Sequence, residues 1–461
     1  MNKELMEKLV NNMLETGAEY SESYFEDTTS KTYRYINGKL DDISSYSKRG
    51  TSFRIIKDDK YYFSSTDDLS EENLINITNN LKNKLGEKNN HSYINLIEKR
   101  VNNPVIKVRH NEMSTDDKIG YLKKIDDIAR NYSDLISQVD VRFLEEDSYK
   151  KIANSKGVIT SSVEVRTRLF LFVYVSKEGK TANKYSRIDY MMGYEMLDGI
   201  DIEKFVIDTC KDAIESLDAI DFKGGEYPVI IGNGYGAIIL HEACGHALEA
   251  RTVAVNKSIL TGKKNQKIAN SKVTLIDDGS INNLWGSSII DDEGEYSRKN
   301  VLIENGILKN YLVDTFNQKL MNQNANGSSR RESYLYAPTS RMSNTYLAKG
   351  NDKIEEMFKS IDYGVYVKEI EYGGVESATG DFNFHSPNAY IIENGKIGKK
   401  INNVSLMGNC LDVLNNIEMV SSDLEFEGGY CGTSESGTIY VTCGQPCIKV
   451  SKIFIGGNSN E

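Results

Sequence analysis

Several residue types and patterns are scarce in this sequence, and each scarcity excludes a class of protein. The 461 residues include six cysteines, too few for a fold held by a disulfide framework. No stretch approaches the roughly 18 consecutive apolar residues of a membrane-spanning helix, so we expect no membrane partner. The opening segment, MNKELMEKLVNNMLETG, lacks the apolar core and the cleavage site of a signal peptide. We therefore expect a reducing, cytoplasmic location.

Positive charge is also scarce. The 56 lysines and arginines are outnumbered by 67 acidic residues, which gives a net charge of -11, and no long basic run occurs. A surface dedicated to nucleic acid needs clustered basic residues, so we expect no nucleic-acid partner. Hydrophobic residues make up 39% and charged residues 27% of the chain, as in a globular protein. The length predicts two or three domains.

What is present begins with periodic patterns in residues 1–220. Apolar residues recur at helical spacing in three segments: 3–16, 117–130 and 201–219. Asn37-Gly38 lies between two alternating segments, as in a β-hairpin whose turn residues need positive φ, and Asp58-Asp59 has a similar setting. Residues 138–190 are expected to form three or four antiparallel strands. We predict an N-terminal α+β domain, 1–220, with an antiparallel sheet and helices.

The pattern changes after residue 220. An apolar strand around Val229 to Ile231 and a glycine-rich turn precede a helix that carries two histidines. Many short strands follow, separated by turn segments such as DDGS, ENG, YGG and, at 456–459, GGNS. We predict a C-terminal β-rich, barrel-like domain, 221–461, that encloses the histidine helix.

That helix contains LHEACGHALEA, from Leu240 to Ala250. It resembles the zinc-protease pattern His-Glu-x-x-His, but His241 and His246 are five residues apart instead of four. On a regular helix they would point roughly 140° apart. A π-bulge absorbs one extra residue, and Gly245 would ease it because it has no Cβ to clash. Without such a bulge, the pair would be two partly buried histidines on a core helix.

Zinc in a catalytic site needs a third protein ligand. The candidates are Glu249, His385 and a cysteine. Cys431 lies in GGYCG, where the glycines let the backbone approach a ligand closely. Cys443 and Cys447 could pair or bind metal, but two buried thiols are the simpler account, as is core packing for Cys244.

Three further sets of side chains are candidates for supporting roles. Arg330, Arg331 and Arg341 could clamp a peptide carboxylate, or they could form ion pairs in a solvated loop. Asp291 to Gly294, DDEG, could bind a cation, but an acidic surface turn is the preferred interpretation. Tyr334 and His385 could donate to an oxyanion by side-chain type alone.

Eight segments, in order along nearly the whole chain, resemble the TldD/PmbA family of metallopeptidases, and its catalytic TldD-type members in particular. They include GAEYSESYFED, YINGKLDDIS, YPVIIGNGYGAIILHEACGHALEA, TGDFNFHSPNAYIIENGKIG and CGTSESGTIYVTCGQPCIKVSKIFIGG. The resemblance implies that His241, His246 and Cys431 bind zinc and that Glu242 is the catalytic base. The chain departs from the family at two places. Arg251 stands where the family often has an acidic residue, and CGTSES stands where the family usually has a stretch that contains lysine and glutamine.

The resemblance also implies a function. We expect a zinc-dependent peptidase that hydrolyses short or unfolded peptides, with Glu242 activating the water held by zinc. Such proteins form dimers, sometimes with a paralogue that lacks the zinc motif. Two alternatives stay open: a non-catalytic peptide-binding subunit with structural zinc, or a zinc amidase acting on another substrate. The intact Glu242 argues against the first, because a structural site has no use for a base.

Overall fold

The computed structural model describes residues 1–88 and 91–457, and it confirms a mixed α+β fold. Part of the turn predicted at 456–459 lies outside the described residues. None of the helices in these ranges is long and apolar enough to cross a membrane. The helices are α1 Lys3–Leu14, α2 Glu71–Leu85, α3 Thr115–Tyr132, α4 Ile202–Glu215, α5 Ile238–Leu240, α6 Ala250–Val253, α7 Gln318–Met321, α8 Ile354–Lys359 and α9 Cys410–Asn416.

A seven-stranded sheet dominates the N-terminal part, in the order β3-β2-β1-β5-β6-β4, with β7 also paired to β6. All its pairs are antiparallel except β4 beside β6. The predicted hairpin turn is confirmed, because Asn37 and Gly38 have φ of 47° and 81°. The strands are β1 Tyr20–Ile36, β2 Lys39–Lys57, β3 Lys60–Thr66, β4 Ile97–Lys99, β5 Ile136–Asn154, β6 Val158–Lys177 and β7 Lys180–Tyr190.

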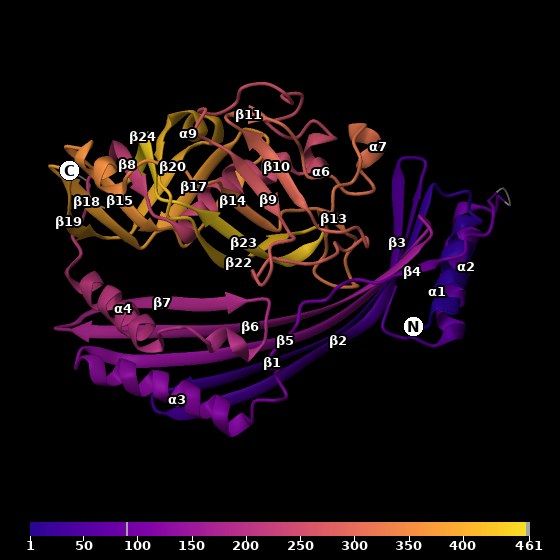
Figure 1. Cartoon of the computed structure of the whole chain (residues 1–461), viewed down its shortest axis with the longest axis horizontal. Helices are drawn as coiled ribbons and strands as arrows, with labels where there is room; N and C mark the ends of the chain where they lie inside the picture. Colours follow the sequence, from indigo (N-terminus) through magenta and orange to yellow (C-terminus); the bar gives the residue numbers. More distant parts are fainter. Residues whose placement is uncertain (89–90, 458–461) are drawn as a thin grey trace.

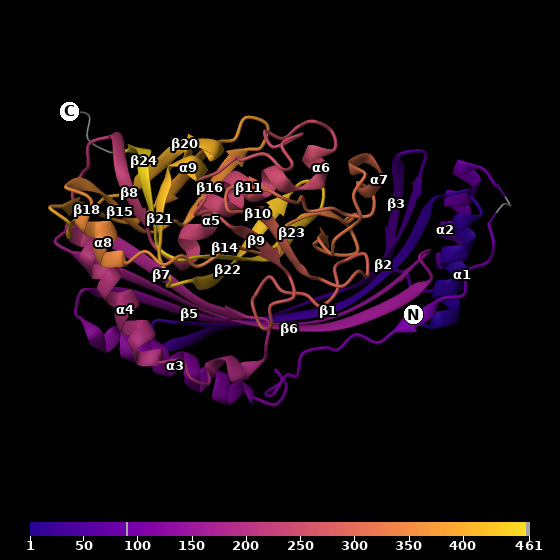
Figure 2. The same cartoon turned by 45° about the horizontal axis from the view of Figure 1, so that its top comes forward.

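The long strands of this sheet curl into a cradle (Figure 1). Helices α3 and α4 cover its convex face, and the C-terminal part of the chain lies on the concave face, as Figure 2 also shows. Alternation along β6 explains the two faces: Leu169 and Leu171 join the core under the helices, whereas Arg166 and Arg168 point to the other side. Helices α1 and α2 pack at one end of the sheet.

Two further sheets build the C-terminal part. The six-stranded sheet has the order β11-β10-β9-β14-β23-β22: Ile307–Leu308, Lys299–Glu304, Leu275–Asp278, Asn344–Leu347, Gly437–Gln445 and Glu425–Thr433. The nine-stranded sheet has the order β16-β17-β20-β24-β8-β15-β18-β19, with β21 also paired to β24: Tyr372–Glu376, Asp381–Ser386, Val404–Asn409, Ile448–Gly456, Gly225–Ile231, Tyr363–Glu369, Asn388–Glu393, Lys396–Ile401 and Ile417–Val420. A two-stranded ribbon pairs β12 Ser329–Arg330 with β13 Thr339–Ser340.

The histidine segment lies between these two sheets. It contacts β14, β22 and β23 of the six-stranded sheet and β15, β16 and β17 of the nine-stranded sheet. Its apolar residues belong to the largest core cluster. The β-rich part therefore encloses the motif, as predicted, while the domain boundary near residue 220 stays a prediction.

Candidate metal centre

The histidine segment changes its helical pitch three times in about four turns. A 3-10 turn at Gly234–Ala237 leads into α5, a π-turn follows at His241–Gly245, and a second 3-10 turn spans His246–Leu248. The π-turn confirms the prediction that one residue is absorbed between the histidines. With it, both imidazoles point to one side, with ring centroids 5.5 Å apart.

The structure gives Gly245 a different role from the predicted one. Its φ of -58° and ψ of -49° are those of an ordinary right-handed helix, so the backbone does not require glycine there. A Cβ on Gly245 would instead lie 1.8 Å from Sδ of Met342. The missing side chain therefore makes room for the packing of Met342 against this turn.

Four side chains converge at this turn: His241, Glu242, His246 and Cys431. One potential ligand atom from each lies within 4.8 Å of all the others. Nε2 of His246 is 3.2 Å from the Cys431 sulfur and 3.3 Å from Oε2 of Glu242. Cys431 comes from β22, which contacts the 3-10 turn that leads into this segment. The structure thus brings together residues that are 185 positions apart in sequence.

This set of donors fits zinc, which prefers imidazole nitrogen and thiolate sulfur in a tetrahedral arrangement. Both ring nitrogens of His241 are buried and have no hydrogen-bond partner among the described residues. Buried polar atoms almost always have a partner, so an orphaned imidazole at this place is what a metal ligand would leave when the metal is taken away.

Electrostatics favour the ligand forms of the acidic groups. Burial raises the pKa of the Cys431 thiol, but His246 and His241 outweigh it and lower that pKa to about 5. Burial likewise opposes ionisation of Glu242, yet the hydrogen bond and charge of His246 lower the pKa of this carboxyl below its usual value. At neutral pH the cluster therefore offers a thiolate and a carboxylate. Burial opposes charge on the two imidazoles, but their acidic neighbours outweigh it and raise the pKa of His241 and of His246 well above the usual value.

The other candidate ligands lie outside the cluster of four, although Glu249 is next to His246 and Cys443 is next to His241. Glu249 is fully buried behind His246, with Oε1 3.2 Å from Nδ1, the nitrogen that faces away from Cys431. His385 lies on β17 and stacks on Tyr372 with ring centroids 4.8 Å apart. Cys244 packs with its sulfur 3.2 Å from that of Cys410. Cys443 and Cys447 are buried free thiols, as the simpler account predicted.

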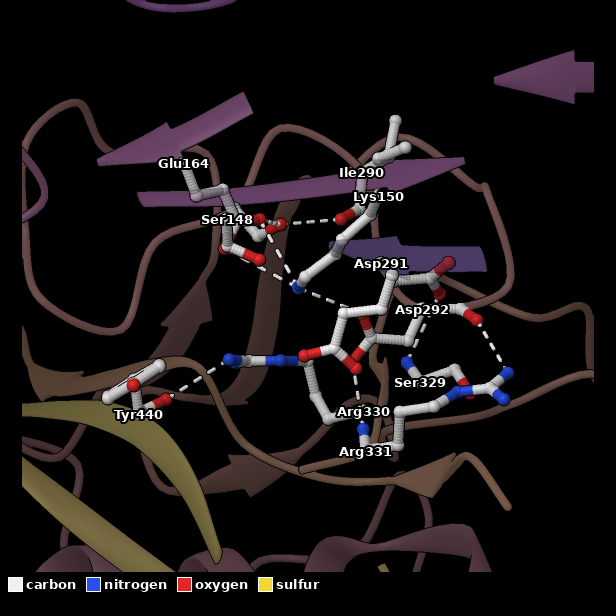
Figure 3. A network of polar contacts seen from close by, with 12 residues as sticks. Ser148, Lys150, Glu164, Ile290, Asp291, Asp292, Ser329, Arg330, Arg331 and Tyr440 are labelled. Atoms are coloured by element: carbon white, nitrogen blue, oxygen red, sulfur yellow. Dashed lines mark hydrogen bonds and ion pairs between the residues drawn. The ribbon is translucent and has the colours of Figure 1, made fainter. Parts of the chain in front are cut away.

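The acidic turn DDEG is not on the surface, and that prediction was wrong. Asp291, Asp292 and Glu293 are each 1% exposed, because they lie between the C-terminal part and the concave face of the sheet. Figure 3 shows their surroundings, in which Lys150 of β5 reaches both Asp292, at 3.0 Å, and Glu164 of β6. The signs of charge alternate in this network, so it is structural.

The three candidate substrate arginines are also buried, so the solvated loop was wrong, whereas the ion pairs of that alternative are confirmed for Arg331 and Arg341. Arg330 donates to the carbonyl oxygens of Gly286, Met342 and Tyr440. Arg331 donates to the carboxylate of Glu22 and to the carbonyl oxygen of Asp292. These two arginines are committed to protein groups of the network in Figure 3. Their burial and partners speak against a clamp for a substrate carboxylate.

Arg341 alone of the three reaches the candidate metal centre. It donates to the carbonyl oxygen of Cys431 at 2.9 Å, and its Nε lies 3.3 Å from Glu249. The two departures from the family pattern meet close by, where Arg251 forms ion pairs with Glu249 at 2.7 Å and with Glu435 of CGTSES at 3.1 Å. Tyr334, by contrast, packs against Gly50 of β2.

Comparison with known proteins agrees with this arrangement. Three profiles of the PmbA/TldA metallopeptidase match in series: domain 1 at residues 22–82, the central domain at 109–217 and the C-terminal domain at 224–457. A metalloprotease TldD homolog from Buchnera aphidicola is 32% identical over 450 residues, which cover 95% of this chain and 93% of that protein.

Two more proteins extend the similarity to archaea. A zinc metalloprotease TldD homolog from Saccharolobus solfataricus is 28% identical over 465 residues, which cover 98% of this chain and 100% of that protein. The crystal structure of TldE from Thermococcus kodakarensis shares the fold, with a TM-score of 0.76 at 19% identity, over 98% of this chain and 100% of that one. On its three domain matches and its identity to the Buchnera protein over nearly the full length, the chain belongs to the TldD/PmbA family of metallopeptidases.

Proposed function

We propose that the protein is a zinc-dependent peptidase in which His241, His246 and Cys431 hold the metal and Glu242 is the general base. The observation that carries the proposal is the convergence of the four side chains within 4.8 Å around a π-turn. Zinc bound there would lower the pKa of a water molecule toward roughly 7 and polarise the peptide carbonyl.

The protein's own residues supply the rest of the chemistry. The lowered pKa of Glu242 keeps its carboxylate ionised at neutral pH, so either oxygen can accept a proton from the attacking water and pass it to the leaving amine. Glu242 is also the only residue of 241–250 that is not buried, with 17% of its side chain exposed. Substrate and water would therefore approach from the Glu242 side.

The surroundings support extended peptides as substrates. Strand β16 lies against the π-turn at the end of its sheet, and on its outer side it has no strand partner among the described residues. Its residues are mostly exposed, including Tyr372 at 60%. An extended chain can add to such an edge through backbone hydrogen bonds, with little demand on its side chains. A folded domain would first have to unfold, at a cost of about 5–15 kcal/mol.

The first experiment combines metal analysis with turnover. Purified protein should contain about one zinc per chain, and Glu242→Gln should keep the zinc while losing at least about 100-fold in peptide hydrolysis. Glutamine is nearly isosteric but takes no proton at neutral pH. Hydrolysis by Glu242→Gln at the wild-type rate would refute the role of Glu242 as base.

A second experiment concerns substrate form. One small protein is supplied folded and as a permanently unfolded variant, and the two cleavage rates are compared. We expect cleavage of the unfolded form alone, with broad sequence tolerance. Equal rates would refute the enclosed site.

Three further expectations belong to this proposal. A zinc amidase would bind zinc in the same way but would fail to cleave peptides in the digest. A non-catalytic subunit would bind zinc and show no turnover of any substrate. A homodimer, or a heterodimer with a paralogue lacking the zinc motif, is expected, and TldE of the archaeal structure is a relative of suitable fold. A cytoplasmic location stays a prediction.

A further inference from the structure

Glu249 occupies a position that neither a ligand nor a surface residue would take. Its side chain is 0% exposed, and it is flanked by one imidazole and two guanidinium groups. Oε1 lies 3.2 Å from Nδ1 of His246 and 3.3 Å from Nε of Arg341, while Oε2 accepts a hydrogen bond from Arg251 at 2.7 Å. The two Oε1 contacts are close approaches between polar groups and not aligned hydrogen bonds.

Arg341 extends these contacts to Cys431, the candidate ligand that comes from β22. Its side chain is 0% exposed. Nη2 donates to the carbonyl oxygen of Cys431 at 2.9 Å, and Nη1 donates to the hydroxyls of Thr433 and Ser436 at 2.9 and 2.7 Å. One guanidinium group therefore connects the carboxylate behind His246 with the backbone of the strand that carries Cys431.

The carboxylate of Glu249 can determine which ring nitrogen of His246 carries the proton. A neutral histidine binds a metal through one nitrogen and carries its proton on the other, so a carboxylate next to Nδ1 selects the tautomer with Nε2 free. Nε2 of His246 is the atom that faces Cys431 and Glu242. Because Glu249 and Arg341 are both fully buried, neither can touch a peptide substrate.

We propose that Glu249 and Arg341 form a buried positioning pair, which sets the tautomer of His246 and the distance of Cys431 from it, and so determines how tightly the site holds zinc. The inference rests on the proposed zinc site and extends it to residues outside the ligand set. In this role neither residue is a ligand or a catalytic residue. Glu249 acts through His246, and Arg341 acts through Glu249 and the Cys431 backbone.

The test measures zinc affinity by competition with a chromophoric chelator. Glu249→Gln keeps the shape of the side chain but removes its charge, and Arg341→Lys keeps the charge but removes the fork that spans the two segments. Each should weaken zinc binding roughly 10- to 100-fold. Glu164→Gln is the matched control, because Glu164 is also a buried carboxylate, 3% exposed, with an arginine partner, Arg166. Its zinc affinity should equal that of the wild type.

The control also separates positioning from general destabilisation. An equal loss of affinity in Glu164→Gln, or wild-type affinity in both Glu249→Gln and Arg341→Lys, would overturn the positioning pair. If the wild-type protein itself bound no zinc, the proposed function would fail first, so the two failures are distinguishable.

A second measurement needs no variant, in case both substitutions prevent folding. The chain has only five histidines, so ¹⁵N-histidine labelling of the zinc-loaded wild-type protein gives a sparse NMR spectrum. We expect His246 to carry its proton on Nδ1. A proton on Nε2 of His246 would contradict the inference.

Discussion

Cys431 and Cys447 show how two buried thiols acquire opposite character from their neighbours. Burial raises the pKa of Cys447 to about 12, whereas the two histidines beside Cys431 outweigh burial and lower its pKa to about 5. Since a thiolate binds zinc and a thiol does not, Cys431 alone of this pair is in the ligand form at neutral pH.

Replacing Cys431 by serine should therefore reduce zinc content strongly, because the two remaining histidines hold zinc poorly. Metal analysis after gel filtration is the measurement. Cys443→Ser and Cys447→Ser are the controls and should keep about one zinc per chain. Loss of zinc from either control, with retention in Cys431→Ser, would show that the third ligand is misassigned.

Asp314 gives the stability of the protein a dependence on pH. Burial, and next the charge of Glu293, raise the pKa of its carboxyl to about 7, whereas an unfolded aspartate titrates near 3.9. Between these values the folded state holds a proton that the unfolded state has lost. This contribution to stability therefore falls as the pH rises from about 4 to about 7.

Asp314→Asn cannot ionise and should remove that fall. The unfolding temperature of the variant minus that of the wild type should therefore be more positive at pH 8 than at pH 5. The corresponding change in the free energy of unfolding is on the order of 1–3 kcal/mol. Thermal unfolding followed by circular dichroism at both pH values checks it. A difference that is the same at both would mean that Asp314 is ionised throughout.

The failure at the acidic turn shows what single residues do not reveal. Asp291 to Glu293 have the composition of a surface turn, but Glu293 pairs with Arg54, which is 239 positions away, and Asp291 accepts from the backbone of Ser329. Nothing in the local sequence indicates these partners. The spacing of three residues places Glu249 near His246, but its ion pair with Arg341, from a distant part of the chain, cannot be read from the local sequence.

Helices and strands are easier to predict from the sequence than tertiary contacts, because the hydrophobic periodicity that marks them is local. The patterns in 3–16, 117–130 and 201–219 became α1, α3 and α4. Helix α2 was missed, although Leu74 and Thr78 are buried at helical spacing and Ser70 precedes the first turn. The many asparagines of this segment obscured the signal. The π-turn was predicted from the one extra residue in the motif, which is a count and needs no tertiary information.

Gly245 tests whether packing maintains the π-turn. Gly245→Ala would place a methyl group on Met342 and should destabilise the protein by roughly 1–3 kcal/mol, with weaker zinc binding. Gly120→Ala is the matched control. Gly120 lies in α3 with nothing within 4 Å of an added Cβ, so the same change should stabilise the protein by roughly 0.5–1 kcal/mol. Denaturant unfolding of both variants distinguishes them; equal stabilisation would refute the packing account.

On the scale of the whole molecule, ion pairs join the cradle to the part that lies on it. Lys150 bridges Glu164 and Asp292, and Arg54 bridges Glu22 and Glu293. Lys150→Met should destabilise the protein by about 3–5 kcal/mol, because it leaves the buried carboxylate of Asp292 without its ion-pair partner, while Glu164 keeps Arg166. Lys204→Met removes one partner of an exposed pair with Asp208 and should leave the unfolding midpoint nearly unchanged. Equal effects of the two changes would contradict a structural role for the network.

The charged concave face of the cradle has a consequence for biosynthesis. Glu22, Arg54, Lys150 and Arg166 all contact a part of the chain that the ribosome makes later. Until that part arrives, these side chains can bind water, so the waiting face stays hydrated where an apolar face would attract other nascent chains. Docking must remove water from these charges, which costs some of the stability that an apolar interface would give. In return, we expect the first-made half to be less prone to aggregation before the rest of the chain docks on it.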